Sequence, residues 1–210
     1  MKNTIIIIVF LTAIISCSSL SAQNLFFEAK AGYAYVDHQR DNYSKASHIP
    51  LNLSLGGGLK HFQIGGDLIL SSILPETYLF YDEFTEEQRV REEIEETYYG
   101  AFLRYNSSYS PETATGFIIK AGAGLLNSKK IVYALPSDVK STEIEYEPAL
   151  QYLGEIGVSI PLGAIVHIYI GGGVTYTKKE IIQNEVQIEN FSQLKYIGQL
   201  GLSVNLDFTN

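Results

Sequence analysis

Three residues of this 210-residue chain have the types that nucleophilic catalysis requires: Ser159, His167 and Glu155. A serine can act as the nucleophile, a histidine as the general base, and a carboxylate can orient the imidazole ring. Alternation along the two segments that carry them places all three side chains on the same side. Whether these three residues can catalyse a reaction therefore depends on whether a substrate can reach the face on which they lie.

The other histidines are His38, His48 and His61, and no two histidines have metal-ligand spacing on a shared face. Glycine runs at 56–58 and 171–173 are not followed by Lys-Ser/Thr or by a helix, so they do not match a phosphate-binding loop. Inside strands, glycine more often marks a bend or a close backbone approach. The sequence predicts no cofactor, no metal and no catalytic residue.

The first residues are typical of a secretory signal peptide. Lys2 gives a basic start, residues 4–15 are almost entirely apolar, and a small-residue cleavage site ends at Ala22. We expect a leader at 1–22 and one mature domain at 23–210. Cys17, the only cysteine, lies in a segment that loosely resembles a lipoprotein box, so a lipidated Cys17 is the alternative to cleavage after Ala22.

The mature chain is acidic. Without Lys2 it has 14 Lys and Arg against 23 Asp and Glu, a net charge of −9. A chain of this charge gains nothing from phosphate attraction, so nucleic acid is not expected as a partner.

Eight segments after the leader alternate apolar and polar residues with the two-residue period of a strand. The clearest is the last, in which Leu194 to Phe208 put Leu, Tyr and Val on one face and Lys, Gln, Ser and Asn on the other. The segments cover residues 27–35, 51–60, 63–70, 96–105, 117–125, 151–160, 166–176 and 194–208. Most have the 9–11 residues that cross a membrane as a tilted strand.

The connections alternate in length, which is typical of outer-membrane barrels with short periplasmic turns and long outer loops. The long connections are 37–48, 75–94, 127–144 and 179–190. Aromatic residues also fall near both ends of the apolar faces, as in the belts at headgroup depth. We therefore predict an all-β fold, an eight-stranded antiparallel up-and-down transmembrane β-barrel.

The polar faces would then form the interior, where five acids meet five bases. Buried charges must be paired, so we expect a salt-bridged plug rather than a pore, with a proton or ion path as the alternative. The expected lumen charge network consists of Glu28, Lys30, Lys60, Asp67, Glu96, Arg104, Lys120, Glu155, Lys195 and Asp207.

The segment 82–93 has the densest charge of the long connections. Thr85 and Gln88 form a capping box, and i,i+4 charge pairs follow, so the sequence predicts a short surface helix or a solvated loop. As a candidate surface site it could contact cations, bridged lipopolysaccharide or a host molecule, through Asp82, Glu83, Glu86, Glu87, Arg89 and Arg91.

The whole mature chain resembles the small outer-membrane β-barrel family, the OmpA/OmpX-like eight-stranded proteins of Gram-negative envelopes. The resemblance rests on the leader, on residues 168–176 and on the ending Gly198 to Phe208, which is similar to the family's C-terminal insertion signal except that two residues follow the aromatic. It implies an outer-membrane location, contact with outer-membrane lipid and lipopolysaccharide, the barrel-insertion machinery as a partner, and a monomer. Members differ in activity, so the fold does not fix the function.

We expect a non-enzymatic barrel that displays outer loops for structural support or surface binding of an extracellular ligand. Two other classes stay open. A soluble lipocalin-like barrel would bind a small apolar ligand and would need its charged face outside. A lipid-modifying barrel enzyme would need Ser159, His167 and Glu155 within reach of lipid.

Overall fold

The computed structural model describes residues 24–38, 46–59, 61–73, 76–82, 85–108, 115–135, 139–183 and 186–207. The expected leader with Cys17, and also Lys60 and Glu83, lie outside the described residues. The strands are β1 (Asn24–His38), β2 (Ala46–Leu59), β3 (Phe62–Ile73), β4 (Glu76–Asp82), β5 (Thr85–Asn106), β6 (Gly116–Leu135), β7 (Val139–Glu145), β8 (Ala149–Pro161), β9 (Val166–Gln183) and β10 (Val186–Asp207).

Eight of these strands close into a barrel, as predicted. The sheet order β5-β3-β2-β1-β10-β9-β8-β6 is closed by the pairing of β5 with β6, and every neighbouring pair is antiparallel. β1 pairs with the last strand, β10, along its own whole length, from Asn24 opposite Asp207 to His38 opposite Gln193. Among the described residues, no helix has the length and apolar character needed to span a bilayer.

The two faces of the barrel have the polarity that the alternation predicts. Along β8, buried and exposed residues alternate at every position from Ala149 to Ile160. The outward residues are apolar and the inward ones are mainly polar or charged: Leu202 is 53% exposed and the adjacent Ser203 is 1% exposed. A soluble lipocalin-like barrel requires the opposite arrangement, so that alternative does not fit the structure.

Short turns join the strands at one end of the barrel, which we call the turn end. The backbone nitrogen of Asn106 donates to the carbonyl of His61, and that of Leu162 donates to the carbonyl of Val166. The ring of Tyr105 lies against the ring of Phe62, with centroids 5.5 Å apart, and both side chains are on the outer surface. At the other end of the apolar face, Tyr35 stands opposite Tyr196, and Tyr152 stands opposite Tyr176.

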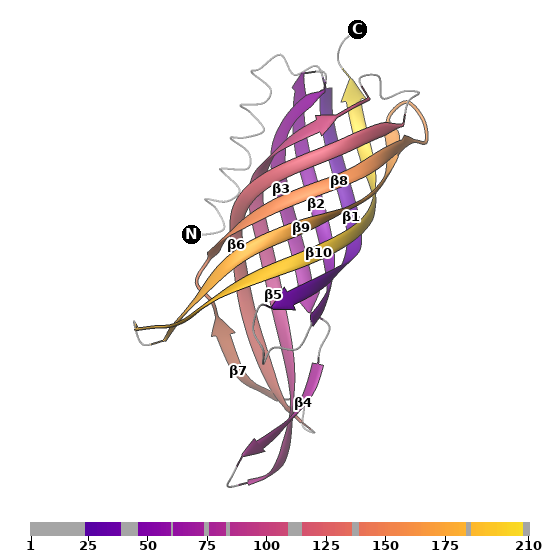
Figure 1. The fold of residues 1–210 in the computed structure, drawn as a ribbon. Helices are drawn as coiled ribbons and strands as arrows, with labels where there is room; N and C mark the ends of the chain where they lie inside the picture. The colour runs from indigo at the N-terminus through magenta and orange to yellow at the C-terminus, as the bar shows by residue number, and fades with distance from the viewer. Residues whose placement is uncertain are drawn as a thin grey trace.

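The opposite end, which we call the hairpin end, carries β4 and β7. β4 pairs with β5 and β7 with β6, so that beyond the barrel the four strands form an antiparallel sheet in the order β4-β5-β6-β7. Figure 1 shows this extension projecting away from the end where β10 finishes. β5 has 22 residues and β6 has 20, about twice what a membrane crossing needs.

These strands show that three of the predicted loops are largely wrong. Much of 75–94, 127–144 and 179–190 is strand: β9 continues to Gln183 and β10 begins at Val186. The helix expected at 82–93 is also wrong, because β5 begins at Thr85 and pairs with both β4 and β6. Cross-strand hydrogen bonding on two sides has overridden the local capping signal.

The apolar outer face of the barrel gives the first prediction. Leu202→Arg places a charge on the outward face of β10 and should destabilise the protein in lipid vesicles by about 2–4 kcal/mol if it lies near mid-membrane. Denaturant unfolding in vesicles measures this cost. Leu202→Phe is the control and should be close to neutral. An equal, small effect of both substitutions would contradict burial of this face in lipid.

Candidate functional site: the charged interior of the barrel

Six charged side chains meet inside the barrel, and we call them the central network. They come from five strands, and none is more than 3% exposed. The six are Glu28 and Lys30 on β1, Asp67 on β3, Arg104 on β5, Lys120 on β6 and Glu155 on β8.

The central network is one chain of ion pairs in which the sign of the charge alternates. Arg104 Nη1 lies 2.8 Å from Glu28 Oε1, and Glu28 Oε2 lies 3.4 Å from Lys30 Nζ. Lys30 Nζ donates to Glu155 Oε1 at 2.6 Å, and Glu155 Oε2 lies 3.1 Å from Lys120 Nζ. Lys120 Nζ also donates to both oxygens of Asp67, at 3.1 and 2.9 Å. Three cations and three anions therefore form a neutral group.

Neutrality decides whether such a group can stay buried. A charge taken out of water without a partner costs several kcal/mol, and removing one member of a buried pair typically costs 3–5 kcal/mol. Arg104 and Lys120 stand directly opposite each other on β5 and β6, a like-charge pair that is unfavourable by itself. Glu28, which comes from across the interior, and Asp67 on β3 offset this repulsion.

Each cation of the central network also lies over an aromatic ring, within the range of a cation–π interaction. The distances from the cation to the ring centroid are 4.6 Å for Lys30 over Tyr169, 4.2 Å for Arg104 over Phe26 and 4.7 Å for Lys120 over Phe102.

Inward glycines make room for these rings. A Cβ atom at Gly56 would lie 2.8 Å from the ring of Phe26, and one at Gly65 would lie 2.6 Å from Cζ of Phe102. Both distances are too short for real contacts, so a larger residue would displace the ring. The runs 56–58 and 171–173 lie inside β2 and β9, which confirms their structural interpretation.

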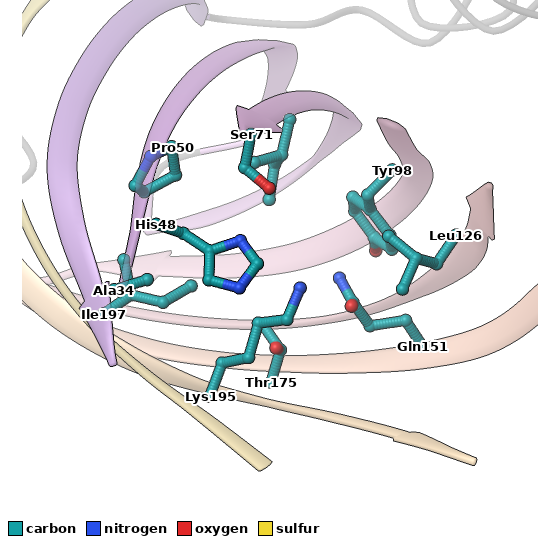
Figure 2. A pocket seen from close by; sticks show the side chains of 11 residues that line it. Ala34, His48, Pro50, Ser71, Tyr98, Leu126, Gln151, Thr175, Lys195 and Ile197 are labelled. Carbon is teal, nitrogen blue, oxygen red and sulfur yellow. The ribbon is translucent and has the colours of Figure 1, made fainter. Parts of the chain in front are cut away.

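A second cluster lies nearer the hairpin end, where the ammonium of Lys195 on β10 donates to Glu96 Oε2 on β5. His48 Nδ1 on β2 is 3.7 Å from the same oxygen, and Ser71 Oγ on β3 is 3.5 Å away. Beside this cluster is a cavity of about 20 Å³. Figure 2 shows side chains from several strands turned into this space.

An apolar layer lies between the second cluster and the central network on one side of the interior, on strands β3, β5, β6 and β8. It consists of Ile69, Tyr98, Leu126 and Leu153, which pack together and are at most 6% exposed. Leu153 lies one inward position from Glu155 of the central network. On this side of the barrel, charged, apolar and again charged residues therefore follow one another along the interior.

The predicted lumen network is largely where the sequence placed it. Eight of its ten residues are buried in the interior: Glu28, Lys30, Asp67, Glu96, Arg104, Lys120, Glu155 and Lys195. Lys60 lies outside the described residues, and for Asp207 the structure describes only the backbone, at the end of β10.

The candidate catalytic group is only partly assembled. Ser159 Oγ lies 3.1 Å from His167 Nδ1, and both side chains are buried. Glu155, expected to orient the histidine, instead pairs with Lys30 and Lys120. The pair points into the filled interior, away from the lipid-facing surface. Among the described residues, no group of three or more His, Cys, Asp or Glu could hold a metal ion.

The candidate surface residues fall on the extension. Asp82 ends β4, and β5 carries Glu86, Glu87, Arg89 and Arg91; the structure describes only the backbone at these positions. The side chains that are described nearby include Glu95 on β5 and the ion pair of Lys129 on β6 with Glu143 on β7.

Four interior residues were not identified from the sequence: Phe26, Phe102, Tyr169 and His48. All four occupy inward positions of their strands. Alternation is the signal that places them there, but an aromatic ring has no charge to distinguish an inward position from an outward one. His48 was assigned to the edge of an outer loop, whereas it is fully buried against Glu96.

No family model matches the chain, and no curated protein matches it. Solved structures do. The crystal structure of Neisserial surface protein A has a TM-score of 0.55 at 15% identity, over 86% of this chain and 96% of that one. Ail, the attachment invasion locus protein of Yersinia pestis, in complex with the heparin analogue sucrose octasulfate, has a TM-score of 0.50 at 10% identity, over 87% and 99%. This chain has the fold of the small eight-stranded outer-membrane barrels.

The second prediction concerns the central network. Glu155→Gln leaves the network with one excess positive charge and should destabilise the protein by about 3–5 kcal/mol. Adding Lys30→Met restores neutrality and should recover much of this loss. Glu143→Gln breaks a partly exposed pair and should cost no more than about 1 kcal/mol. Unfolding in detergent or vesicles measures all three, and equal costs for Glu155→Gln and Glu143→Gln would contradict the role of burial.

The third prediction is a closed interior. An eight-stranded barrel has room only for its own side chains, and here ion pairs and the apolar layer fill it. The pure protein reconstituted in planar bilayers should therefore show no stable conductance of porin size. Steady, large conductance steps would show that the interior opens.

Proposed function

We propose that this chain is an integral outer-membrane protein that binds a partner at the cell surface, and that it is neither an enzyme nor a channel. The observation that supports it most is the polarity of the barrel, which has an apolar outer surface around a filled interior of no net charge. The similar solved structures are bacterial outer-membrane barrels, which supports the same location. Outer-membrane lipid surrounds the apolar face in this proposal.

The interior argues against transport and catalysis as the main role. The central network and the apolar layer occupy the space that a solute would need. The Ser159–His167 pair faces this filled space, and Glu155 is held by two lysines. We therefore place the function on the hairpin end.

The extension suits a binding role because it is a hydrogen-bonded sheet rather than a loose loop. β5 pairs with β6 continuously from Arg89 opposite Leu135 to Asn106 opposite Ile118, so the extension continues the barrel wall. A recognition surface held in this way loses little conformational entropy on binding. With the hairpin end outside the cell, the extension stands above the membrane surface.

The charge of the extension indicates the partner. Between 82 and 93 there are six acids, including Glu86 and Glu87, against two arginines, Arg89 and Arg91. Such a surface attracts a basic partner and repels anionic lipopolysaccharide unless Ca²⁺ or Mg²⁺ bridges the two. Ail was solved with a sulfated ligand; we expect the opposite preference here. Binding should weaken as salt rises.

The fourth prediction tests this surface. Replacing residues 76–92 by Asn-Gly removes β4 and the part of β5 paired with it, but keeps the β3–β5 ladder of the barrel. The variant should still fold, shown by heat-modifiable migration in gels, and should lose binding of a lysine-rich peptide. Sucrose octasulfate should bind neither form.

The matched control shortens another hairpin at the same end, by replacing 181–189 with Asn-Gly between β9 and β10. It should keep peptide binding. Full binding by the 76–92 variant would move the site elsewhere. A 76–92 variant that failed to form a barrel would instead assign the extension a structural role.

A further inference from the structure

The turn between β8 and β9 is made of apolar residues. From Ile160 to Val166 the chain reads Ile-Pro-Leu-Gly-Ala-Ile-Val, with no side chain that is charged or can form a hydrogen bond. Every residue from Leu162 to Val166 is exposed, with Leu162 at 61% and Ile165 at 48%. Turns in water are normally built from Asn, Asp, Ser and other polar residues beside Gly and Pro. This composition therefore suits surroundings less polar than water.

The turn continues the lipid-facing surface of the barrel. On β8 the outward positions are apolar without a break from Leu150 to Ile160, which is the length of a full membrane crossing. On the far side of the turn, Val166 on β9 stands opposite Val204 on β10, and both side chains point outward. Because the turn follows a complete crossing directly, it lies at the depth of the lipid headgroups.

The backbone of the turn is tied to the barrel. The nitrogen of Leu162 donates to the carbonyl of Val166 at 2.9 Å, and the carbonyl of Ile165 accepts from the nitrogen of Asn205 on β10 at 2.8 Å. Such bonds matter near lipid, where an unpaired backbone group is costly. Figure 1 shows the turn beside the end of β10. A Cβ atom added to Gly163 would meet no described atom within 4 Å, so the tip stands clear of the described chain.

Two other connections at the turn end have polar tips. The β2–β3 turn contains Lys60 and His61, and His61 Nδ1 lies 2.8 Å from the carbonyl oxygen of Asn106. The connection after β5 begins with Asn106, Ser107 and Ser108, and Ser107 Oγ accepts from the nitrogen of Phe117 at 2.7 Å. In the closed sheet the β2–β3 and β8–β9 turns lie on opposite sides, with β1 and β10 between them one way round and β5 and β6 the other way. The turn end is therefore polar on one side and apolar on the other.

We propose that the β8–β9 turn, residues 161–165, is inserted into the headgroup region of the phospholipid leaflet at the turn end, while the β2–β3 and β5–β6 connections stay in water. The barrel then sits inclined in the bilayer, with its β8–β9 side deeper. This inference rests on the membrane location in the proposed function, and it does not depend on the partner proposed for the hairpin end.

Continuity with the lipid-facing surface favours phospholipid over a protein as the occupant. The exposed side chains of Leu162 and Ile165 run into those of Ile160 and Val166 with no polar residue between them. A patch that binds a protein is typically rimmed by polar residues, and charges usually set the orientation of the partner. This turn has neither. At headgroup depth, Leu and Ile side chains are stabilised by burial at the boundary with the acyl chains.

Single tryptophans can measure the depth of the turn, because the chain has no tryptophan of its own. The variants Leu162→Trp, Ser107→Trp and Leu202→Trp would each be refolded into phosphatidylcholine vesicles. Their fluorescence would be quenched by acrylamide in the water, or by lipids brominated at defined positions of the acyl chain. Ser107→Trp is the matched control at the turn end, and the backbone nitrogen of residue 107 can still donate to the carbonyl of Phe117.

Leu162→Trp should emit at short wavelength and be quenched most by bromines near the headgroup. Ser107→Trp should emit at long wavelength and be quenched by acrylamide, and Leu202→Trp should be quenched most by bromines deep in the chain. Equal quenching of the two turn variants, by either quencher, would overturn the inclined position. If only these two agreed, Leu202→Trp would still support the membrane location. Leu202→Trp unaffected by any brominated lipid would overturn that location and this inference together.

A polar substitution gives a second measurement, because tryptophan itself prefers the membrane interface. Leu162→Ser keeps the backbone nitrogen that donates to Val166, so only the side chain changes. In lipid, the loss of apolar burial should lower the denaturant midpoint in vesicles, whereas Leu162→Met should keep it. An unchanged midpoint for Leu162→Ser would show that the side chain stands in water and would overturn the inference.

Discussion

The hydrocarbon core of a bilayer offers the peptide backbone no hydrogen-bond partner, and the rest of this structure depends on that constraint. A sheet can meet it only by closing on itself, so that no strand edge faces lipid. Here closure joins the first strand over its whole length to the last, from Asn24–Asp207 to His38–Gln193. Once the sheet is closed, alternation sends half of the side chains to lipid and half into a narrow interior. The apolar exterior and the charged interior are two results of the same closure.

The charges in the interior are removed from water, so each of them must be paired with an opposite charge. The central network does so with six charges arranged in strict alternation from Arg104 to Asp67, and each cation also covers an aromatic ring. Inward glycines such as Gly56 and Gly65 give up side-chain volume so that those rings fit. The charged groups, the rings and the glycines therefore pack as one unit. A substitution at any one of them should disturb the packing of the other two.

The sequence predicted the barrel because alternation over eight segments is a local property that closure does not alter. It also placed eight of the ten expected lumen charges on the correct face. It could not predict which charges would pair. On neighbouring strands Arg104 faces Lys120, which looks unfavourable, and only the curvature of the closed sheet brings Glu28 across to Arg104. The pairing depends on register and shear, which no short stretch of sequence specifies.

At the hairpin end, the local sequence predicted the wrong secondary structure. Residues 85–93 are rich in Glu and Arg and carry a capping box, so local propensity favours a helix. The structure keeps them extended because β5 has a hydrogen-bonded neighbour on each side, and those long-range ladders outweigh the local preference. This part of β5 has no lipid beside it in the proposed topology, so its residues need not alternate between apolar and polar. The barrel proper is constrained on both faces, by lipid outside and by charge matching inside. The extension is the part of the chain where sequence can change without either constraint, and that is the physical reason to place a binding function there.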